Sequence, residues 1–512
     1  MFSEIAKIKT IYFILLLLFI NILAHYLPFE RISLSPDDYS RLNKPQLGFQ
    51  NFIFGPSDRP LHFFLVDLQN YYVKDNPYYG FLINIVCNSF LLFIIWKFLE
   101  LFYEKKEEIF FISLIFILLF NKVEIYHTPI YSINVLAAIL YLLSIYFFIK
   151  GIRLNSIFLF LFSIIFYVLG IFLYEIGFFI VLIFLYLLLQ NQKRNSLIFF
   201  ILAVLISLFY ISYRLTNSFG YSEMLNAHSF EINKIPYGII DLIHNYIGRT
   251  SFRIAIYGIY NFLFIDNYWL ILILVFNLIL LFIIKRLNDK SANNLKKIKT
   301  NDKFFFIFLF VVFSIPPIIN GMASGRHTIV PDISLSIFIF YILFIIFKKN
   351  NYLIICVTFL LLIINQGNSW TQVISCRINN AIYDYIKNLD KDKIINSDYI
   401  IFDQGSFSRN IKHTLLNNDK ILERYFGAQA LEDQTVVSMI AYNKNINKKN
   451  VTDKFIRVID FKNNGFNSYN MKIIEQTEYR NFKYTNYDLT TKNLILINYS
   501  NVYNNGYRYG NR

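Results

Sequence analysis

The sequence has only three cysteines among its 512 residues, and their positions exclude a disulfide framework. Cys87 and Cys356 fall inside apolar runs, and Cys376 lies just beyond the last of these runs, so a zinc site is not indicated either. Charge is also scarce, since charged residues make up 16% of the chain and hydrophobic residues 56%. Soluble domains carry about 25% charged residues, so this composition excludes a typical soluble globular protein.

The sequence also lacks an internal repeat and a Gly/Ser-rich linker, and its dominant feature is a series of long apolar runs. Runs such as YFILLLLFINILA and WLILILVFNLILLFII suit helices that cross about 30 Å of hydrocarbon, which takes roughly 20 residues. The first run has no small-residue cleavage site and further runs follow it, so we interpret it as a retained helix. The sequence predicts a polytopic α-helical membrane protein with about eleven transmembrane helices. They are expected at 8–27, 79–102, 109–121, 131–149, 156–172, 176–190, 196–213, 267–285, 303–319, 331–347 and 351–366.

The connections between these runs differ in charge. Six of them (MFSEIAKIK, EKKEE, KGIRLN, QNQKRN, KRLNDKSANNLKKIKTNDK and KKNN) hold 17 Lys and Arg, whereas the short connections of the other set hold two. The positive-inside rule then predicts a cytoplasmic N-terminus, and an odd number of spans predicts a C-terminus outside. The formal charge of +15 reports this orientation first, and we expect no nucleic-acid partner.

The tail at 367–512 has no long apolar run and is predicted to form an extracytoplasmic α/β domain, separate from a transmembrane domain at 1–366. AIYDYIKNL is typical of a helix, and DYIIFD, FIRVIDF and NLILINYS are typical of strands. The mildly basic surface of this domain suits phospholipid headgroups or an acidic acceptor, but the sequence favours an ordinary solvated surface.

The outer loop at 28–78 is the most informative segment. It contains Asp37, Asp38 and Arg41, and from Pro60 onward its apolar residues follow a helical spacing that predicts an amphipathic helix in the membrane interface. A carboxylate under such a helix is partly desolvated, so its basicity rises and it can act as a general base. The alternative is that PDDY is only a turn with helix-capping Asp residues.

Three further outer connections carry ionisable residues. Glu124 and His127 lie in NKVEIYHTPI, where a structural histidine is the alternative. Glu175 lies between two apolar runs in LYEIGFF, and such a residue is either functional or a solvated turn carboxylate. Arg326 and His327 lie in GMASGRHTIVP, where an arginine suits a phosphate ligand or lipid headgroups. Together these groups favour transfer from a lipid phosphate donor.

The order of these motifs resembles the GT-C glycosyltransferases, integral-membrane enzymes that use polyprenyl-phosphate sugars, and most of all their protein O-mannosyltransferase-like branch. The matching elements are Asp37-Asp38, Arg59-Pro60-Leu61, Asn84 and Asn88 in the second span, His127-Thr128-Pro129, Tyr174-Glu175, and Gly325-Arg326-His327 with Pro331. No WWDYG-like signature is present, which argues against an oligosaccharyltransferase, and no tetratricopeptide repeat is visible in the tail.

The resemblance implies an inverting transfer to an extracytoplasmic hydroxyl of a glycan, lipid or protein, in the cytoplasmic membrane of a bacterium. One of Asp37 and Asp38 would be the catalytic base, with Glu124 or His127 assisting. Arg326 would hold the donor phosphate, and the resemblance implies that the substrate site also includes Arg41, Arg59, His127, Glu175 and His327. No organic cofactor is implied, and the sequence leaves open whether a divalent metal binds.

Two other functions compete with this interpretation. An O-antigen-type polymerase would also use lipid-linked substrates, but it is expected to rely on Arg-rich outer loops. A lipid or glycan flippase is expected to carry charges along the middle of several spans, or interrupted helices in matching halves. The predicted spans are nearly free of central charges, and Lys97 and Glu100 lie near a cytoplasmic end.

Overall fold

In the computed structural model of the chain, the helical part is described at residues 2–27, 59–73, 77–127, 131–191, 193–216, 234–291, 300–319, 321, 325–343 and 351–387, and five short strands are described beyond it. The chain divides into two compact units. The first contains the helices as far as Trp370, and the second includes Thr371–Arg512.

Each of the eleven segments predicted to span a membrane coincides with or overlaps a helix. These helices are α1 (Phe2–His25), α5 (Pro77–Leu99), α6 (Lys106–Leu118), α8 (Ser132–Leu154), α9 (Ile157–Leu173), α10 (Ile180–Asn191), α11 (Arg194–Thr216), α15 (Asn267–Ser291), α16 (Thr300–Ile319), α17 (Ile329–Tyr341) and α18 (Asn351–Lys387). Within the described residues, six of them (α5, α8, α11, α15, α16 and α18) are long and apolar enough to cross a membrane. The helical, multi-pass character is therefore as predicted, and the count of eleven crossings stays a prediction.

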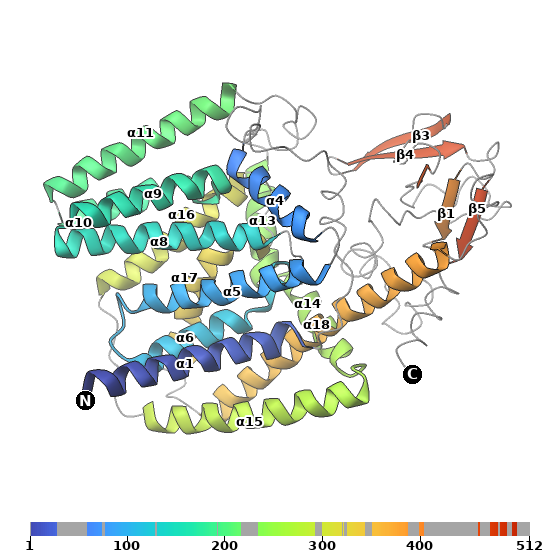
Figure 1. Cartoon of the computed structure of the whole chain (residues 1–512), viewed down its shortest axis with the longest axis horizontal. Helices are drawn as coiled ribbons and strands as arrows, with labels where there is room; N and C mark the ends of the chain where they lie inside the picture. The colour runs from blue at the N-terminus through green and yellow to red at the C-terminus, as the bar shows by residue number, and fades with distance from the viewer. Residues whose placement is uncertain are drawn as a thin grey trace. The chain divides into compact units, whose positions relative to one another are not determined.

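The helices of the first unit lie side by side (Figure 1), and small and aromatic side chains pack them against one another. Between α8 and α9, the hydroxyls of Ser144 and Ser163 each donate to the other residue's carbonyl oxygen at 2.8 Å. Such reciprocal bonds between small residues allow close helix approach where the surroundings are apolar. Phe148 and Phe184 join α8 to α10 with stacked rings whose centroids are 4.2 Å apart.

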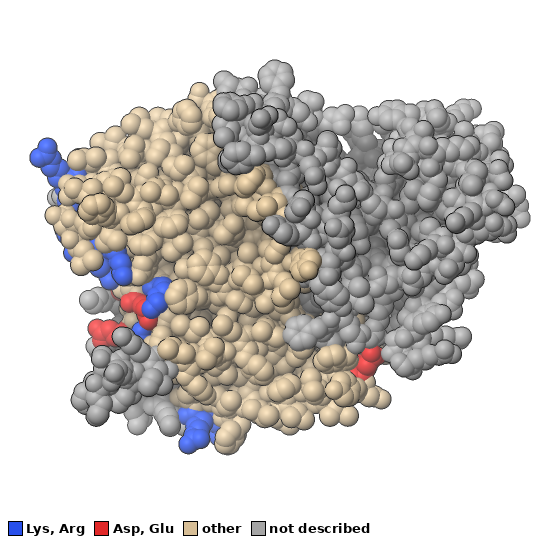
Figure 2. Space-filling model, in the orientation of Figure 1, with Lys and Arg blue, Asp and Glu red and all other residues tan. Residues whose placement is uncertain are grey.

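The surface of the helical unit is divided by charge. Figure 2 shows Lys and Arg gathered near the end where the chain begins and a broad uncharged area beside them. Arg153, Arg194, Lys285 and Arg286, in or beside the connections of that end, are exposed. An uncharged belt next to a basic end is the arrangement expected of a bilayer-spanning protein with its basic side inward.

The opposite end of the helical unit, here named the site end, carries the shorter elements (Figure 1). They are α4 (Pro60–Val73), η1 (Phe120–Lys122), α7 (Val123–His127), η3 (Glu175–Gly177), α13 (Ile235–Tyr246), α14 (Arg249–Phe262) and η5 (Gly325–His327). Helix α4 begins at Pro60, as predicted, because proline suits the first position of a helix. Helices α13 and α14 lie between the predicted spans 196–213 and 267–285, where the sequence predicts no membrane crossing.

In the second unit, three strands form one sheet and two form a hairpin. Strand β1 (Tyr399–Asp403) pairs in parallel with β5 (Leu494–Asn498) and antiparallel with β2 (Ile459–Asp460). Strands β3 (Lys472–Tyr479) and β4 (Phe482–Asp488) form the antiparallel hairpin. β1, β2 and β5 lie within the three segments predicted as strands, and the assignment of this unit as an extracytoplasmic domain stays a prediction.

Candidate functional site

An ion pair joins two of the predicted residues across the site end. Arg59 lies directly before α4 and Glu175 begins η3, and a guanidinium nitrogen of Arg59 donates to a carboxylate oxygen of Glu175. Both side chains are mostly buried, with 21% and 15% of their surface exposed. Because a partly desolvated pair is screened less than a surface pair, it can hold α4 and η3 in a defined arrangement.

Tyr174 lies between the charged groups of this end. Its hydroxyl is 2.8 Å from Nε2 of His327, and the two rings are parallel within 3°. The Arg59 guanidinium carbon lies 5.3 Å from the Tyr174 ring centroid, and the His62 ring stacks on it with centroids 6.5 Å apart. Burial raises the pKa of the Tyr174 hydroxyl, while Arg326 and Arg59 act to lower it. The hydroxyl therefore stays protonated near neutral pH and can donate to a neutral His327.

Arg326 is positioned by close packing of η5 against η1. A side chain at Gly325 would meet the Asn121 carbonyl oxygen at 1.9 Å, so only glycine permits this approach. The Arg326 guanidinium carbon then lies 4.6 Å from the ring centroid of Tyr131, at the start of α8. A guanidinium held flat on an aromatic ring keeps its charge and its planar hydrogen-bonding edge.

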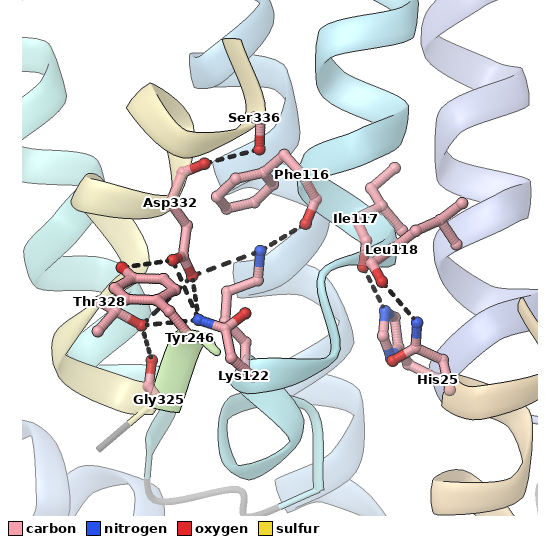
Figure 3. A network of polar contacts seen from close by, with 12 residues as sticks. His25, Phe116, Ile117, Leu118, Lys122, Tyr246, Gly325, Thr328, Asp332 and Ser336 are labelled. Carbon is pink, nitrogen blue, oxygen red and sulfur yellow. Dashed lines mark hydrogen bonds and ion pairs between the residues drawn. The ribbon is translucent and has the colours of Figure 1, made fainter. Parts of the chain in front are cut away.

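At the C-terminal end of α6, the last carbonyls are capped by side chains (Figure 3). Lys122 Nζ donates to the Phe116 carbonyl, His25 Nε2 lies 2.9 Å from the Ile117 carbonyl, and Asn365 Nδ2 donates to the Leu118 carbonyl at 2.9 Å. A helix end leaves such carbonyls without intrahelical partners, and a cation there is also favoured by the helix dipole. Segments far apart in the chain thus converge on one helix end.

Lys122 also faces Asp332 in a fully buried ion pair, with Nζ 3.7 Å from Oδ2 and neither side chain exposed. Asp332 lies in the first turn of α17, and its carboxylate accepts from Asn121 at 3.0 Å and from the Tyr246 hydroxyl at 2.8 Å. Thr328 donates to the same carboxylate at 3.3 Å. Figure 3 shows these side chains turned toward one carboxylate. Burial lowers the pKa of Lys122, and the neighbouring carboxylate acts in the opposite direction.

These five residues, Asn121, Lys122, Tyr246, Thr328 and Asp332, are named the polar core network from here on. They join η1, α13, η5 and α17, so they hold the turn that carries Arg326 and His327. The sequence reading did not select them. A lone lysine and a lone aspartate beside apolar runs were the available signal, but nothing in the sequence indicates that they pair.

Asn84 and Asn88, the asparagines of the second predicted span, are buried on α5. Asn84 accepts from the Tyr26 hydroxyl at 2.6 Å and donates to the Ile125 carbonyl of α7 at 2.9 Å. Asn88 donates to the Asn84 side-chain oxygen at 2.8 Å. Their observed role is to anchor α7, the short helix that carries Glu124 and His127.

The structure brings together four of the predicted site residues, namely Arg59, Glu175, Arg326 and His327. The backbone of Glu124 and His127 lies in α7, which packs against η5, but their side chains lie outside the described set. Asp37, Asp38 and Arg41 lie outside the described residues. Their approach to this cluster stays a prediction.

Among the described side chains, no group of three His, Cys, Asp or Glu residues could hold a metal ion. The side chains of Asp37, Asp38 and Glu124 are not in that set. Whether a divalent ion binds therefore stays open.

The cluster at the site end can bind an anion. Among the described side chains, this cluster holds the guanidinium groups of Arg59 and Arg326 and the carboxylate of Glu175, beside two imidazoles and a protonated tyrosine. Arginine presents a planar fork of N–H donors that matches phosphate oxygens, and partial burial strengthens such contacts. The arrangement is therefore suited to a phosphate at the end of the bundle.

No protein-family model matches the chain, and no curated protein matches it either. The function must therefore be argued from the residues and their geometry.

Proposed function

We propose that the chain is an integral-membrane glycosyltransferase that moves a sugar from a polyprenyl-phosphate donor to an extracytoplasmic hydroxyl. The observation that carries the proposal is the convergence of Arg59, Glu175, Arg326 and His327 around Tyr174 at one end of the helix bundle. The resemblance of the motif order to GT-C enzymes supports the same conclusion. Six apolar helices supply the bilayer setting in which a lipid-linked donor would be found.

In the proposed reaction, the acceptor oxygen attacks the anomeric carbon from the face opposite the phosphate. The bond between the anomeric carbon and the phosphate oxygen breaks, and polyprenyl phosphate leaves with the electron pair. The acceptor proton goes to the base, for which Asp38 and Asp37 are the candidates, with Asp38 preferred because Asp37 directly follows Pro36 and suits the turn. The configuration at the anomeric carbon inverts.

Each described residue has a role that follows from its contacts. Arg326 holds the phosphate of the bound donor and also stabilises the charge that develops on it as the bond breaks. Glu175 holds Arg59 against the ring of Tyr174 and keeps it oriented. Tyr174 fixes the ring of His327, so that its second nitrogen can face the phosphate.

One observation favours a transporter instead, and it is the buried Lys122–Asp332 pair. Ionisable pairs inside transporters mark ion or proton pathways, usually near the middle of the membrane. Here Lys122 follows the end of α6 and Asp332 lies in the first turn of α17, so the pair is at helix ends. That position, together with the capping of α6, favours a structural role for the pair.

The test is to incubate the purified full chain in lipid nanodiscs with a panel of radiolabelled polyprenyl-phosphate sugars and to measure donor turnover. We expect one donor to release its sugar. Asp37→Asn and Asp38→Asn should be expressed normally, and at least one of them should abolish transfer. In a second assay the chain is placed in lipid vesicles. Movement of the lipid-linked sugar across the vesicle membrane, with the bond between sugar and phosphate intact, would indicate a flippase. Full activity of both variants would remove the assigned base, and a chain of repeat units as product would indicate a polymerase.

A further inference from the structure

Helices α13 and α14 form a hairpin at the site end, joined at Ile247 and Gly248. They contain 12 and 14 residues. At 1.5 Å per residue their lengths are about 18 and 21 Å, short of the roughly 30 Å of hydrocarbon. Neither helix crosses a bilayer alone, yet the pair lies between spans and is rich in apolar residues.

The two helices bury their small and polar residues and expose many of their apolar ones. Toward the protein, α13 buries Gly238 and Asn245, and α14 buries Ser251 and Asn261 together with Ile254, Tyr257 and Phe262. Ile247 at the turn is 86% exposed and Phe252 66%. The other exposed large apolar residues of the hairpin and of the turn after it are Tyr237, Ile239, Ile240, Ile243, Ile259, Leu263 and Phe264. So many large apolar side chains exposed on one face indicate contact with an apolar medium rather than with water.

Close backbone packing prevents the hairpin from rolling its apolar face inward. A side chain at Gly238 would meet the Ile318 carbonyl oxygen at 2.2 Å, and one at Gly258 would meet the Ile364 carbonyl oxygen at 2.3 Å. The hairpin is thus fixed against α16 near its last residue and against α18. Since the apolar window of α16 ends at Ile319 and that of α18 at Trp370, the hairpin lies at the level where these spans end.

The apolar surface continues onto a membrane-spanning helix. Helix α15 begins at Asn267, shortly after α14 ends, and its outward residues Ile271, Leu278 and Phe282 are exposed along a span that is long and apolar enough to cross the bilayer. Tyr268, at the start of α15, is also exposed, and aromatic residues favour the headgroup level. One edge of α13 is polar, with Asp241 exposed.

We infer that the outward face of the α13–α14 hairpin is embedded in the bilayer, at the boundary between headgroups and acyl chains on the side of the site end. An amphipathic helix in that position sinks its apolar face about 5–10 Å below the headgroups. The occupant of this face is therefore lipid. The inference does not depend on the proposed sugar transfer.

The hairpin also contacts the polar core network through the Tyr246 hydroxyl on Asp332. That carboxylate in turn accepts from Thr328, at the end of the turn that carries Arg326 and His327. The depth at which the hairpin inserts therefore sets the position of the turn with Arg326 and His327 relative to the lipid headgroups.

The test uses spin labels on the full chain in phosphatidylcholine–phosphatidylglycerol vesicles. The background is a triple variant, Cys87→Ser, Cys356→Ser and Cys376→Ser, and single cysteines are then introduced as Ile247→Cys and Phe252→Cys. Asp241→Cys on the polar edge is the matched control, and Leu278→Cys on α15 is the lipid-facing reference. Each exposed position tolerates a label, and equal elution of every variant in size-exclusion chromatography checks its fold.

The measurement compares collisions of the label with oxygen, which partitions into lipid, and with a water-soluble nickel chelate. We expect the oxygen-to-nickel ratio at 247 and 252 to exceed that at 241 several-fold and to approach the ratio at 278. Greater access for nickel at 247 and 252 would place the face in water and overturn the inference. Protection of 247 and 252 from both reagents would also overturn it. Dipolar broadening of the label spectrum would then show that a second copy covers the face, and its absence would show that the chain itself covers it.

Discussion

Among single side chains, Arg326 is the one whose contacts bear most directly on the proposed donor. Its guanidinium lies against the ring of Tyr131, and its positive charge acts to lower the pKa of the Tyr174 hydroxyl. A glycine beside it allows η5 to pack on η1, so the arginine is directed by the backbone as well as by its own contacts. A cation placed in this way interacts with a ligand charge without first losing much side-chain freedom.

Arg326→Ala should raise the KM for the polyprenyl-phosphate donor by about tenfold to a hundredfold, because hydrogen bonds to charged groups contribute about 1.5–3 kcal/mol. The KM for the acceptor should change little, and steady-state kinetics with each substrate varied in turn measures both. Arg153→Ala removes an exposed arginine of α8 near the basic end and is the matched control. An unchanged donor KM in Arg326→Ala would count against the phosphate role.

The buried pair of Lys122 and Asp332 makes a separate prediction about stability. Lys122→Met leaves the Asp332 carboxylate buried without its cation, and Asp332→Asn does the reverse. Each change should lower the free energy of unfolding by about 3–5 kcal/mol, and the double variant should lose less than the sum of the two. Denaturant titration in detergent micelles measures all three values.

The control for these variants is the partly exposed pair of Lys97 and Glu100, whose side chains are 37% and 22% exposed. Lys97→Met should cost less than about 1 kcal/mol because water screens the charges. Losses in the Lys122 and Asp332 variants that are additive, or no larger than in this control, would show that the buried pair is not coupled.

For single residues, the sequence identified charged side chains of the site but did not show which residues they contact. Arg59, Glu175, Arg326 and His327 could be found because an ionisable residue beside an apolar run stands out. The pairing of Lys122 with Asp332 could not be found, because it depends on how α6 and α17 pack. His62 joins the site through the first turn of α4, and nothing in its own sequence neighbourhood distinguishes it.

Among the elements, the long apolar helices were predictable and the short ones were not. The predicted segments coincide with helices because sustained apolar runs carry their signal over many residues. Helices α13 and α14 lack such runs. Their apolar residues face outward at a helical spacing, and a pattern of that kind within a long loop is weaker evidence than a run.

The hydrogen bond from Asn84 of α5 to α7 predicts that α7 loses its position when this asparagine is replaced. Asn84→Leu removes the donor to the Ile125 carbonyl and the acceptor of the Tyr26 hydroxyl, which leaves buried polar groups without these partners. We expect a loss of about 1–3 kcal/mol in unfolding free energy. Sugar transfer should fall further than the loss of folded protein explains, because α7 carries Glu124 and His127.

The matched control is Val86→Ala on the same helix, where the side chain is 63% exposed. This variant should unfold like the parent and keep its activity. Equal stability of Asn84→Leu and Val86→Ala would mean that the asparagine does not anchor α7. A stable Asn84→Leu protein with full activity would show that this anchoring of α7 is not needed for sugar transfer.

At the scale of the whole molecule, orientation is the property that connects the charges of the loops with the site. The basic connections and the site end lie at opposite ends of the helical unit, and Figure 2 shows the basic side chains gathered at the first of these. The positive-inside rule then predicts that the site end faces outside, where the proposed lipid-linked donor and extracytoplasmic acceptor would meet.

Reporter fusions test this orientation in a bacterial host. Alkaline phosphatase, which is active only after export, should be active when fused after residue 512 and inactive when fused within the basic connection at 292–299. A green fluorescent protein, which folds in the cytoplasm, should give the opposite result at both positions. The two fusion points lie on opposite sides only if the number of crossings between them is odd, so the pair also tests part of the predicted count. The orientation would be contradicted if the phosphatase fused within 292–299 were active, whether or not the fusion after residue 512 is active too. That result would place the cluster around Tyr174 on the cytoplasmic side, away from the predicted acceptor.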